Sequence, residues 1–298
     1  MHARDLLRLG MIDEAGRIAE AEIARVSDNG DTAALWSARF IRAEILSMRG
    51  RTDAALKYLD SFAAPEADAC SVGFKLNRGR YLGLLGRHGE ARVLLAEAES
   101  SACGARYLEL LGEIYLSQAY LSYVRKEYES SDRAFRLALD VSNEVGGWYI
   151  RAHSLWGIGK VLMIQRCYKG AMSWFEESLK IFEGVGAKLS MATVWGEMAV
   201  CQLGMGEDQD ALELLLKAAA AEHSAGFLRN YHVTLADLGN VYLHRRDYLM
   251  ALSYYQRAVS LAREIEDPVS VKKWTYNINL AYARIRAQVD QDCPRPAA

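Results

Sequence analysis

The sequence predicts an all-α protein built from a row of antiparallel helix pairs. Three observations support this: a scarcity of helix breakers, a repeat of about 40 residues, and small side chains that recur in register. The chain has 298 residues, is 51% hydrophobic and contains only four prolines, of which Pro294 and Pro296 lie in its last five residues. Because proline disrupts helix interiors while Ala and Leu favour helices, this composition indicates a nearly all-helical chain.

Length and charge narrow the class of protein. A chain of 298 residues exceeds what one compact core usually organises, which favours either two domains or a solenoid. The formal net charge is -2, with acids and bases interspersed, so we expect no nucleic-acid partner. No apolar run is long enough to span a membrane, and the first ten residues lack a signal-peptide core. We therefore expect a cytoplasmic protein without a membrane partner.

Small side chains recur at two positions of each repeat. Near the start of each predicted second helix stand Ala15, Ala55, Ala91, Ser131, Ala171, Ala211 and Ala251. Twelve residues earlier, in each predicted first helix, stand Ala3, Ala43, Gly79, Ala119, Gly159, Ala199 and Gly239. Antiparallel helices cross closely only where small side chains face each other. The register therefore predicts about seven helix pairs.

Bulky residues and glycines follow the same period. Four residues after the small second-helix position come Leu59, Leu95, Phe135, Phe175, Leu215 and Tyr255, and only the first repeat departs, with Ala19. This spacing places the bulky residue on the same helical face as the small one. Glycines that can adopt positive φ mark the predicted helix ends: Gly10, Gly50, Gly86, Gly146, Gly186, Gly206 and Gly226.

These features set the expected boundaries. We expect first helices near 31–49, 67–85, 105–125, 148–165, 188–204 and 228–245. We expect second helices near 13–26, 53–62, 88–99, 128–145, 168–183, 208–224 and 248–265. Residues 269–289 form a last, polar capping helix in this scheme, so one solenoid covers 1–289 and a disordered tail covers 290–298. The segment before residue 10 is too short for a full first helix: either the first repeat is frayed and incomplete, or the chain was cut from a longer protein.

The pattern resembles the tetratricopeptide repeat family. The clearest unit contains Leu235, Gly239, Tyr242, Tyr248, Ala251, Tyr255 and Ala258, and a second contains Leu155, Gly159, Tyr168, Ala171 and Phe175. The period of 40 resembles the long-repeat variety of kinesin light chains and bacterial tetratricopeptide signalling regulators. The resemblance implies a right-handed α–α superhelix. It also implies a scaffold that binds a protein or peptide segment, such as the regulatory or sensing module of a signalling protein.

The resemblance further implies that the first helices line a concave groove. The expected inward residues include Phe40, Leu76 and Leu116, and the expected partner-binding residues are Tyr120, Tyr123, Trp156, Lys160, Arg80, Asn240, Asn277 and Lys273. Aromatic residues in a groove are typical binding anchors, and an amide can both donate to and accept from an extended backbone. The alternatives are that these aromatics only pack between repeats and that the asparagines are solvated. Ala236 stands where chaperone-binding relatives have a lysine, which argues against a full carboxylate clamp.

Motifs for chemistry are missing from the sequence. The six histidines form no H-E-x-x-H, the five cysteines form no C-x-x-C, and no G-x-S-x-G occurs. We therefore expect no catalytic site, metal or cofactor, and reduced cysteines. Two other readings stay open: an architectural module that self-associates, or the accessory domain of a longer enzyme or transcription regulator. The sequence leaves the oligomeric state open.

Overall fold

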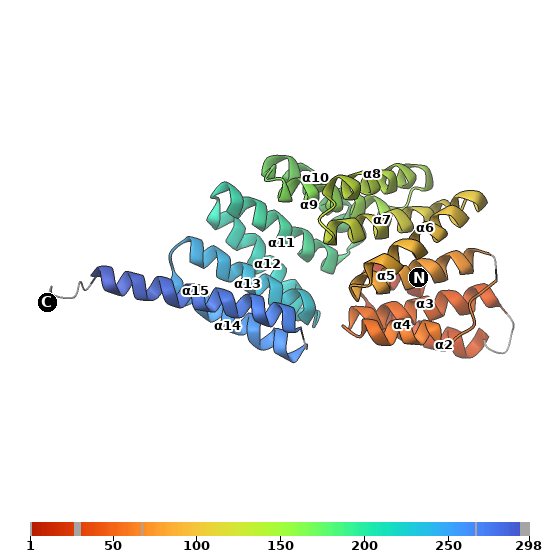
Figure 1. Cartoon of the computed structure of the whole chain (residues 1–298), viewed down its shortest axis with the longest axis horizontal. Helices are drawn as coiled ribbons and strands as arrows, with labels where there is room; N and C mark the ends of the chain where they lie inside the picture. The colour runs from red at the N-terminus through yellow and green to blue at the C-terminus, as the bar shows by residue number, and fades with distance from the viewer. Residues whose placement is uncertain (1, 27–30, 67, 266, 293–298) are drawn as a thin grey trace. The chain divides into compact units, whose positions relative to one another are not determined.

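The computed structural model describes residues 2–26, 31–66, 68–265 and 267–292, and within them it has fifteen α-helices and no strand (Figure 1). The first ten helices are α1 (Ala3–Arg8), α2 (Ile12–Val26), α3 (Thr32–Met48), α4 (Thr52–Asp60), α5 (Ala69–Leu84), α6 (His88–Ala105), α7 (Leu108–Val124), α8 (Tyr128–Val145), α9 (Trp148–Ile164) and α10 (Tyr168–Val185). The others are α11 (Lys188–Met205), α12 (Asp208–Ser224), α13 (Leu228–His244), α14 (Tyr248–Glu264) and α15 (Pro268–Asp292). The predicted all-α fold of seven helix pairs plus a capping helix is confirmed.

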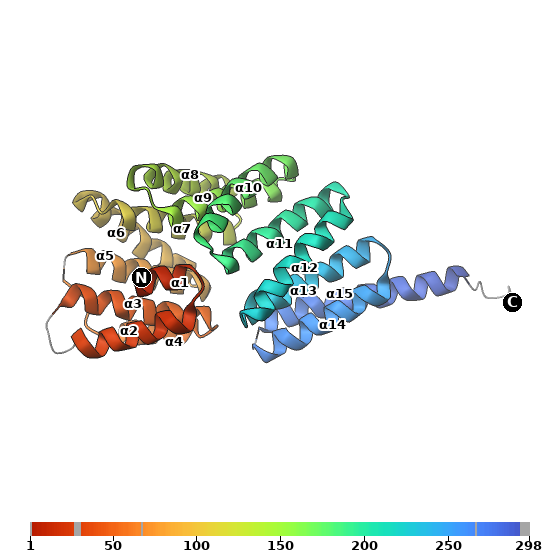
Figure 2. The ribbon, with the colours of Figure 1, turned by 180° about the vertical axis from the view of Figure 1, so that it is seen from behind.

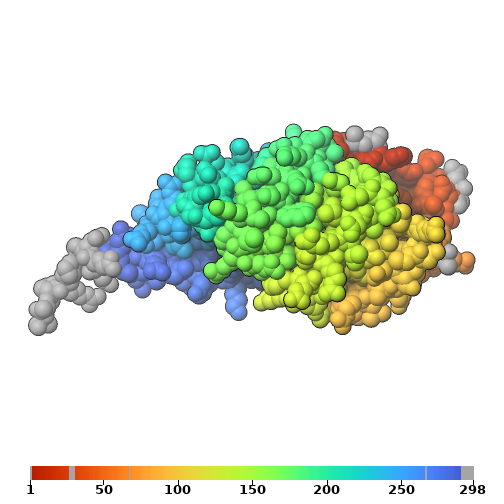
Figure 3. Space-filling model, turned by 90° about the horizontal axis from the view of Figure 1, so that it is seen from above, coloured from red at the N-terminus to blue at the C-terminus, as the bar shows by residue number. Residues whose placement is uncertain are grey.

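The chain divides into two compact units. Unit 1 is Met1–Ala187, with α1 to α10, and unit 2 is Lys188–Ala298, with α11 to α15. Within each unit every helix packs on the next. In the space-filling view, segments that follow one another in the sequence lie next to one another (Figure 3). The single solenoid over 1–289 stays a prediction.

The small side chains face the helix crossings, as predicted. All fourteen are buried in the structure. In one pair the two small positions are joined directly, because the Ser131 hydroxyl donates a 2.9 Å hydrogen bond to the Ala119 carbonyl. In two others the bulky residue lies flat on the first-helix glycine: a methyl group on Gly159 or Gly239 would lie 2.6 Å from an aromatic carbon of Phe175 or Tyr255.

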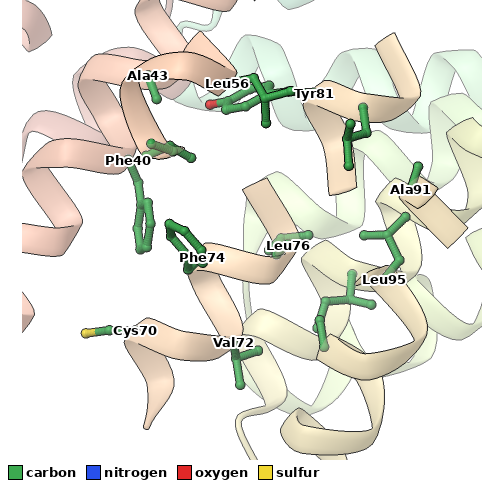
Figure 4. Packing of buried hydrophobic residues seen from close by; sticks show 14 of the residues in the cluster. Phe40, Ala43, Leu56, Cys70, Val72, Phe74, Leu76, Tyr81, Ala91 and Leu95 are labelled. Atoms are coloured by element: carbon green, nitrogen blue, oxygen red, sulfur yellow. The ribbon is translucent and has the colours of Figure 1, made fainter. Parts of the chain in front are cut away.

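Aromatic and aliphatic side chains fill the core of unit 1 near its start. The ring of Trp36 lies 5.5 Å from that of Phe40 and 5.4 Å from that of Phe74, and Figure 4 shows the two phenylalanines next to each other. The expectation that Phe40, Leu76 and Leu116 face inward is wrong, because all three are buried in the core. The reason is the contact between neighbouring first helices: Phe40 of α3 packs on Gly73 of α5.

Two helices end three or more residues later than predicted. Helix α6 continues to Ala105, because Arg106 takes the left-handed conformation, with φ of 57°, that Gly146 takes one repeat later. Helix α15 continues to Asp292, so 290–292 of the expected tail are helical, and residues 293–298 lie outside the described residues. Lys126, Arg166 and Arg246 likewise adopt positive φ where other repeats carry glycine.

Candidate functional site

The first-helix face of unit 1 is the surface formed by α1, α3, α5, α7 and α9. It brings together four of the predicted binding residues. The rings of Tyr120 on α7 and Trp156 on α9 have centroids 5.9 Å apart. The Lys160 ammonium lies 4.7 Å from the ring of Trp156 and 5.0 Å from that of Tyr123, which is cation–π geometry. All four side chains are half-buried.

Two further residues of α9 extend this cluster toward α1. The His153 ring lies 4.4 Å from that of Tyr149 and 6.0 Å from that of Trp156, and its Nδ1 is 3.4 Å from the Tyr120 hydroxyl. We call Tyr120, Tyr149, His153 and Trp156 the aromatic row. Sequence analysis missed Tyr149, although its position one turn before His153 on the same helix face was a usable signal.

Two half-buried ion pairs flank the aromatic row. Arg80 on α5 makes a bidentate pair with Glu44 on α3, at 2.8 and 3.2 Å, so this predicted binding residue already has a partner. Arg8 on α1 donates to Glu113 on α7 at 2.5 Å and lies 3.4 Å from the carboxylate of Glu109. No feature of the sequence pointed to the Arg8 contact, because it joins residues more than a hundred positions apart.

Burial and these ion pairs keep the aromatic row uncharged. Burial, reinforced by the positive charges of Arg8 and Arg80, lowers the pKa of His153 to about 4. Burial raises the pKa of the Tyr149 hydroxyl to about 12. At neutral pH the row therefore offers neutral rings and hydrogen-bonding groups between paired charges, which suits an extended polypeptide better than a highly charged ligand.

In unit 2 the predicted residues are less available. The Asn240 carbonyl oxygen accepts a 2.7 Å hydrogen bond from the Tyr255 hydroxyl, and its amide nitrogen donates to Asp237 at 3.1 Å. One N–H remains for a ligand. The exposed Lys273 lies over the ring of Trp274 at 4.3 Å. Asn277 is half-buried, and no hydrogen bond joins it to another residue within the described ranges. A binding role for these residues stays a prediction.

Two carboxyl groups of unit 2 lie in unfavourable surroundings. Burial raises the pKa of Glu222 to about 7, and its Oε2 has no hydrogen-bond partner among the described residues. Burial, followed by the negative charge of Glu197, raises the pKa of Asp237 to about 7, against the opposing effect of Lys273. Both groups are therefore sensitive to pH near neutrality.

Two features are absent from the part of the chain that the structure describes. No group of three or more His, Cys, Asp or Glu side chains there is placed to hold a metal ion. In the same part of the chain, no helix combines the length and apolarity that crossing a membrane requires.

Two stretches of the sequence match models of a known repeat family. Two models described as tetratricopeptide repeat match this sequence, one over residues 72–97 in α5 and α6 and one over residues 233–268 in α13 and α14. The chain therefore contains tetratricopeptide repeats. The second match is the helix pair whose Gly239 lies against Tyr255. No curated protein sequence matches this chain.

Solved structures of other proteins share the fold of this chain at low sequence identity. A Rap protein complexed with competence and sporulation factor matches with a TM-score of 0.74 at 16% identity, covering 97% of this chain and 86% of that one. Aspartyl phosphate phosphatase F from Bacillus subtilis matches with a TM-score of 0.61 at 13% identity, covering 97% and 80%. A signal transduction ATPase with numerous domains from Pyrococcus horikoshii, which carries a tetratricopeptide repeat sensor, matches with a TM-score of 0.65 at 17% identity. That match covers 96% of this chain but only 47% of the ATPase.

Proposed function

We propose that this tetratricopeptide repeat protein is a protein-interaction module, and that unit 1 binds an extended protein segment on its first-helix face. The aromatic row carries the proposal. It places four half-buried rings from two neighbouring helices side by side, although the small and bulky residues of each repeat already fill the helix crossings. Aromatic side chains in such positions are the commonest anchors of protein interfaces.

Hydrogen-bonding groups in the row support an extended segment as the ligand. The indole N–H of Trp156 has no acceptor among the described residues. A buried donor without an acceptor is unfavourable by about 1–3 kcal/mol, so a backbone carbonyl that reached it would bind favourably. Neighbouring hydroxyl and imidazole groups of Tyr120 and His153 can pair with further backbone groups.

A regulatory or sensing role is the finer part of this proposal. Its support is the fold shared with a Rap protein solved with a bound factor and with an ATPase whose repeats serve as a sensor. In this role the bound segment changes the activity of a partner protein, and the repeats themselves catalyse nothing.

The test is affinity capture with matched variants. The double variant Tyr120→Ala/Trp156→Ala removes two rings of the aromatic row, one from each helix. The matched variant Tyr168→Ala/Trp174→Ala removes two half-buried aromatics from α10, which lies outside the first-helix face. Both variants must first give a wild-type circular dichroism spectrum. We expect the wild type and the α10 variant to recover the same partner and the first variant to lose it. Equal recovery by all three proteins contradicts the proposal.

A further inference from the structure

One contact in unit 1 departs from the way a repeat array is held together. In such arrays each repeat contacts its neighbours and little else. Arg8, in the first repeat, instead contacts Glu109 and Glu113 of the fourth repeat, 101 and 105 residues further along the chain. It also contacts Tyr149 of the fifth repeat. The Arg8 side chain therefore crosses the first-helix face on which we propose that a partner binds.

The groups around Arg8 form a site suited to a guanidinium ion. Nη2 of Arg8 lies 2.5 Å from Glu113, and both side chains are only 15% exposed. Glu109 adds a second carboxylate at 3.4 Å, and the guanidinium carbon lies 4.6 Å above the ring of Tyr149. Carboxylates on one side and an aromatic face on another are what a planar guanidinium binds best. We call Glu109, Glu113 and Tyr149 the guanidinium site.

The helix that carries Arg8 is short and lies at the start of the repeat array. Helix α1 has six residues, of which Ala3, Leu6 and Leu7 are buried. It packs against α2 and α3 (Figure 2). A helix of this length is not stable by itself, and segments with few buried residues are the first to open locally. Local opening of α1 alone would release Arg8 from the guanidinium site.

We propose that Arg8 is an internal stand-in for an arginine of the bound segment, which takes its place at Glu109, Glu113 and Tyr149 and displaces α1. The inference rests on the proposed function, since it names the chemistry of the segment that unit 1 binds. The guanidinium site and the aromatic row share Tyr149, so an extended chain can place an arginine in the first and its neighbouring residues along the second.

The first test empties the site and fills it with the simplest probe. Arg8→Ala removes the occupant, and guanidinium chloride at low millimolar concentration replaces it, with sodium chloride at equal ionic strength as the reference. We expect the probe to raise the melting temperature of Arg8→Ala, and to do so neither in the wild type nor in Arg8→Ala/Glu113→Gln. The matched control is Arg49→Ala, which removes an exposed cross-repeat ion pair with Asp13, at 2.7 Å, that has no aromatic face. An equal response in Arg8→Ala and Arg49→Ala overturns the proposal.

The second test measures displacement in the wild type. The probe is Nα-acetyl-arginine amide, with the lysine analogue as its control, and the readout is hydrogen exchange of the amides of α1. At a concentration ten times the Kd measured with Arg8→Ala, linkage predicts about tenfold faster exchange in α1 and no change in α3. Unchanged exchange in α1 overturns the displacement.

The two proposals can fail separately. If neither probe binds while Tyr120→Ala/Trp156→Ala loses its partner, the guanidinium site is wrong and the interaction module stands. If the probes bind but capture does not depend on Tyr120 and Trp156, the proposed function is wrong, and the guanidinium site binds arginine without serving that partner.

Discussion

Substitution of Gly239 by alanine tests the packing rule behind the fold. An added methyl group would lie 2.6, 2.8 and 3.0 Å from three carbons of the Tyr255 ring. That ring is fully buried and is held by its 2.7 Å hydrogen bond to Asn240, so it cannot move aside freely. Overpacking of this kind is unfavourable by about 1–3 kcal/mol. Helix propensity opposes it by about 1 kcal/mol, so we expect a net destabilisation of up to about 2 kcal/mol.

Gly196 provides the control for helix propensity. It lies inside α11 of the same unit, and a methyl group there would meet no atom within 4 Å. Gly196→Ala should therefore stabilise the protein by about 0.5–1 kcal/mol. The assay is denaturant titration with hydrogen exchange in α13 and α14, because repeat arrays need not unfold as one unit. If Gly239→Ala and Gly196→Ala have the same free energy of unfolding, the reasoning about small residues is refuted.

Three further predictions follow from strained or buried groups. Glu222 has its folded-state pKa raised to about 7, so its contribution to stability is present below its ordinary pKa of 4.5 and is lost as the pH rises to about 7. The loss is about 3 kcal/mol. Urea titrations at pH 5 and pH 8 measure it, and Glu222→Gln should remove this part of the pH dependence. An equal change in the free energy of unfolding between the two pH values for variant and wild type contradicts the prediction. Arg166 adopts a φ of 61°, so Arg166→Gly should raise stability by up to about 1 kcal/mol in thermal melts, whereas Gly186→Ala, at φ 74°, should lower it; a loss of stability in Arg166→Gly refutes the strain. Tyr255→Phe removes the donor to Asn240 and should lower the free energy of unfolding by about 1 kcal/mol, and no change in hydrogen exchange of α14 counts against that bond.

Local sequence patterns were enough to predict most of the fold. The small residues, the bulky residues four positions later and the helix-ending glycines all report contacts within a helix pair, which lie close in sequence. Prediction failed where a residue took an unusual conformation without its usual signal, as Arg106 does at the end of α6. It also failed where contacts between neighbouring first helices decided the facing direction, as for Phe40 against Gly73.

The candidate site was less predictable for the same physical reason. Spacing along α9 and the repeat register were enough to bring Trp156 and Lys160 next to Tyr120 and Tyr123. The contact of Arg8 with Glu113 depends on how the first four repeats curve together, and no local pattern records that curvature. Asn240 was predicted to bind a partner, and its amide bonds internally to Asp237 and Tyr255, so that role stays a prediction.

Site-specific photo-crosslinking tests the binding surface most directly. A benzophenone amino acid is placed either at Tyr123, on the first-helix face, or at Trp174, on α10, and each protein is irradiated in lysate. If a partner binds the first-helix face, we expect a crosslinked partner from position 123, its loss on adding Tyr120→Ala, and no crosslink from position 174. Crosslinks from position 174 alone would place the partner on the second helices and contradict the account.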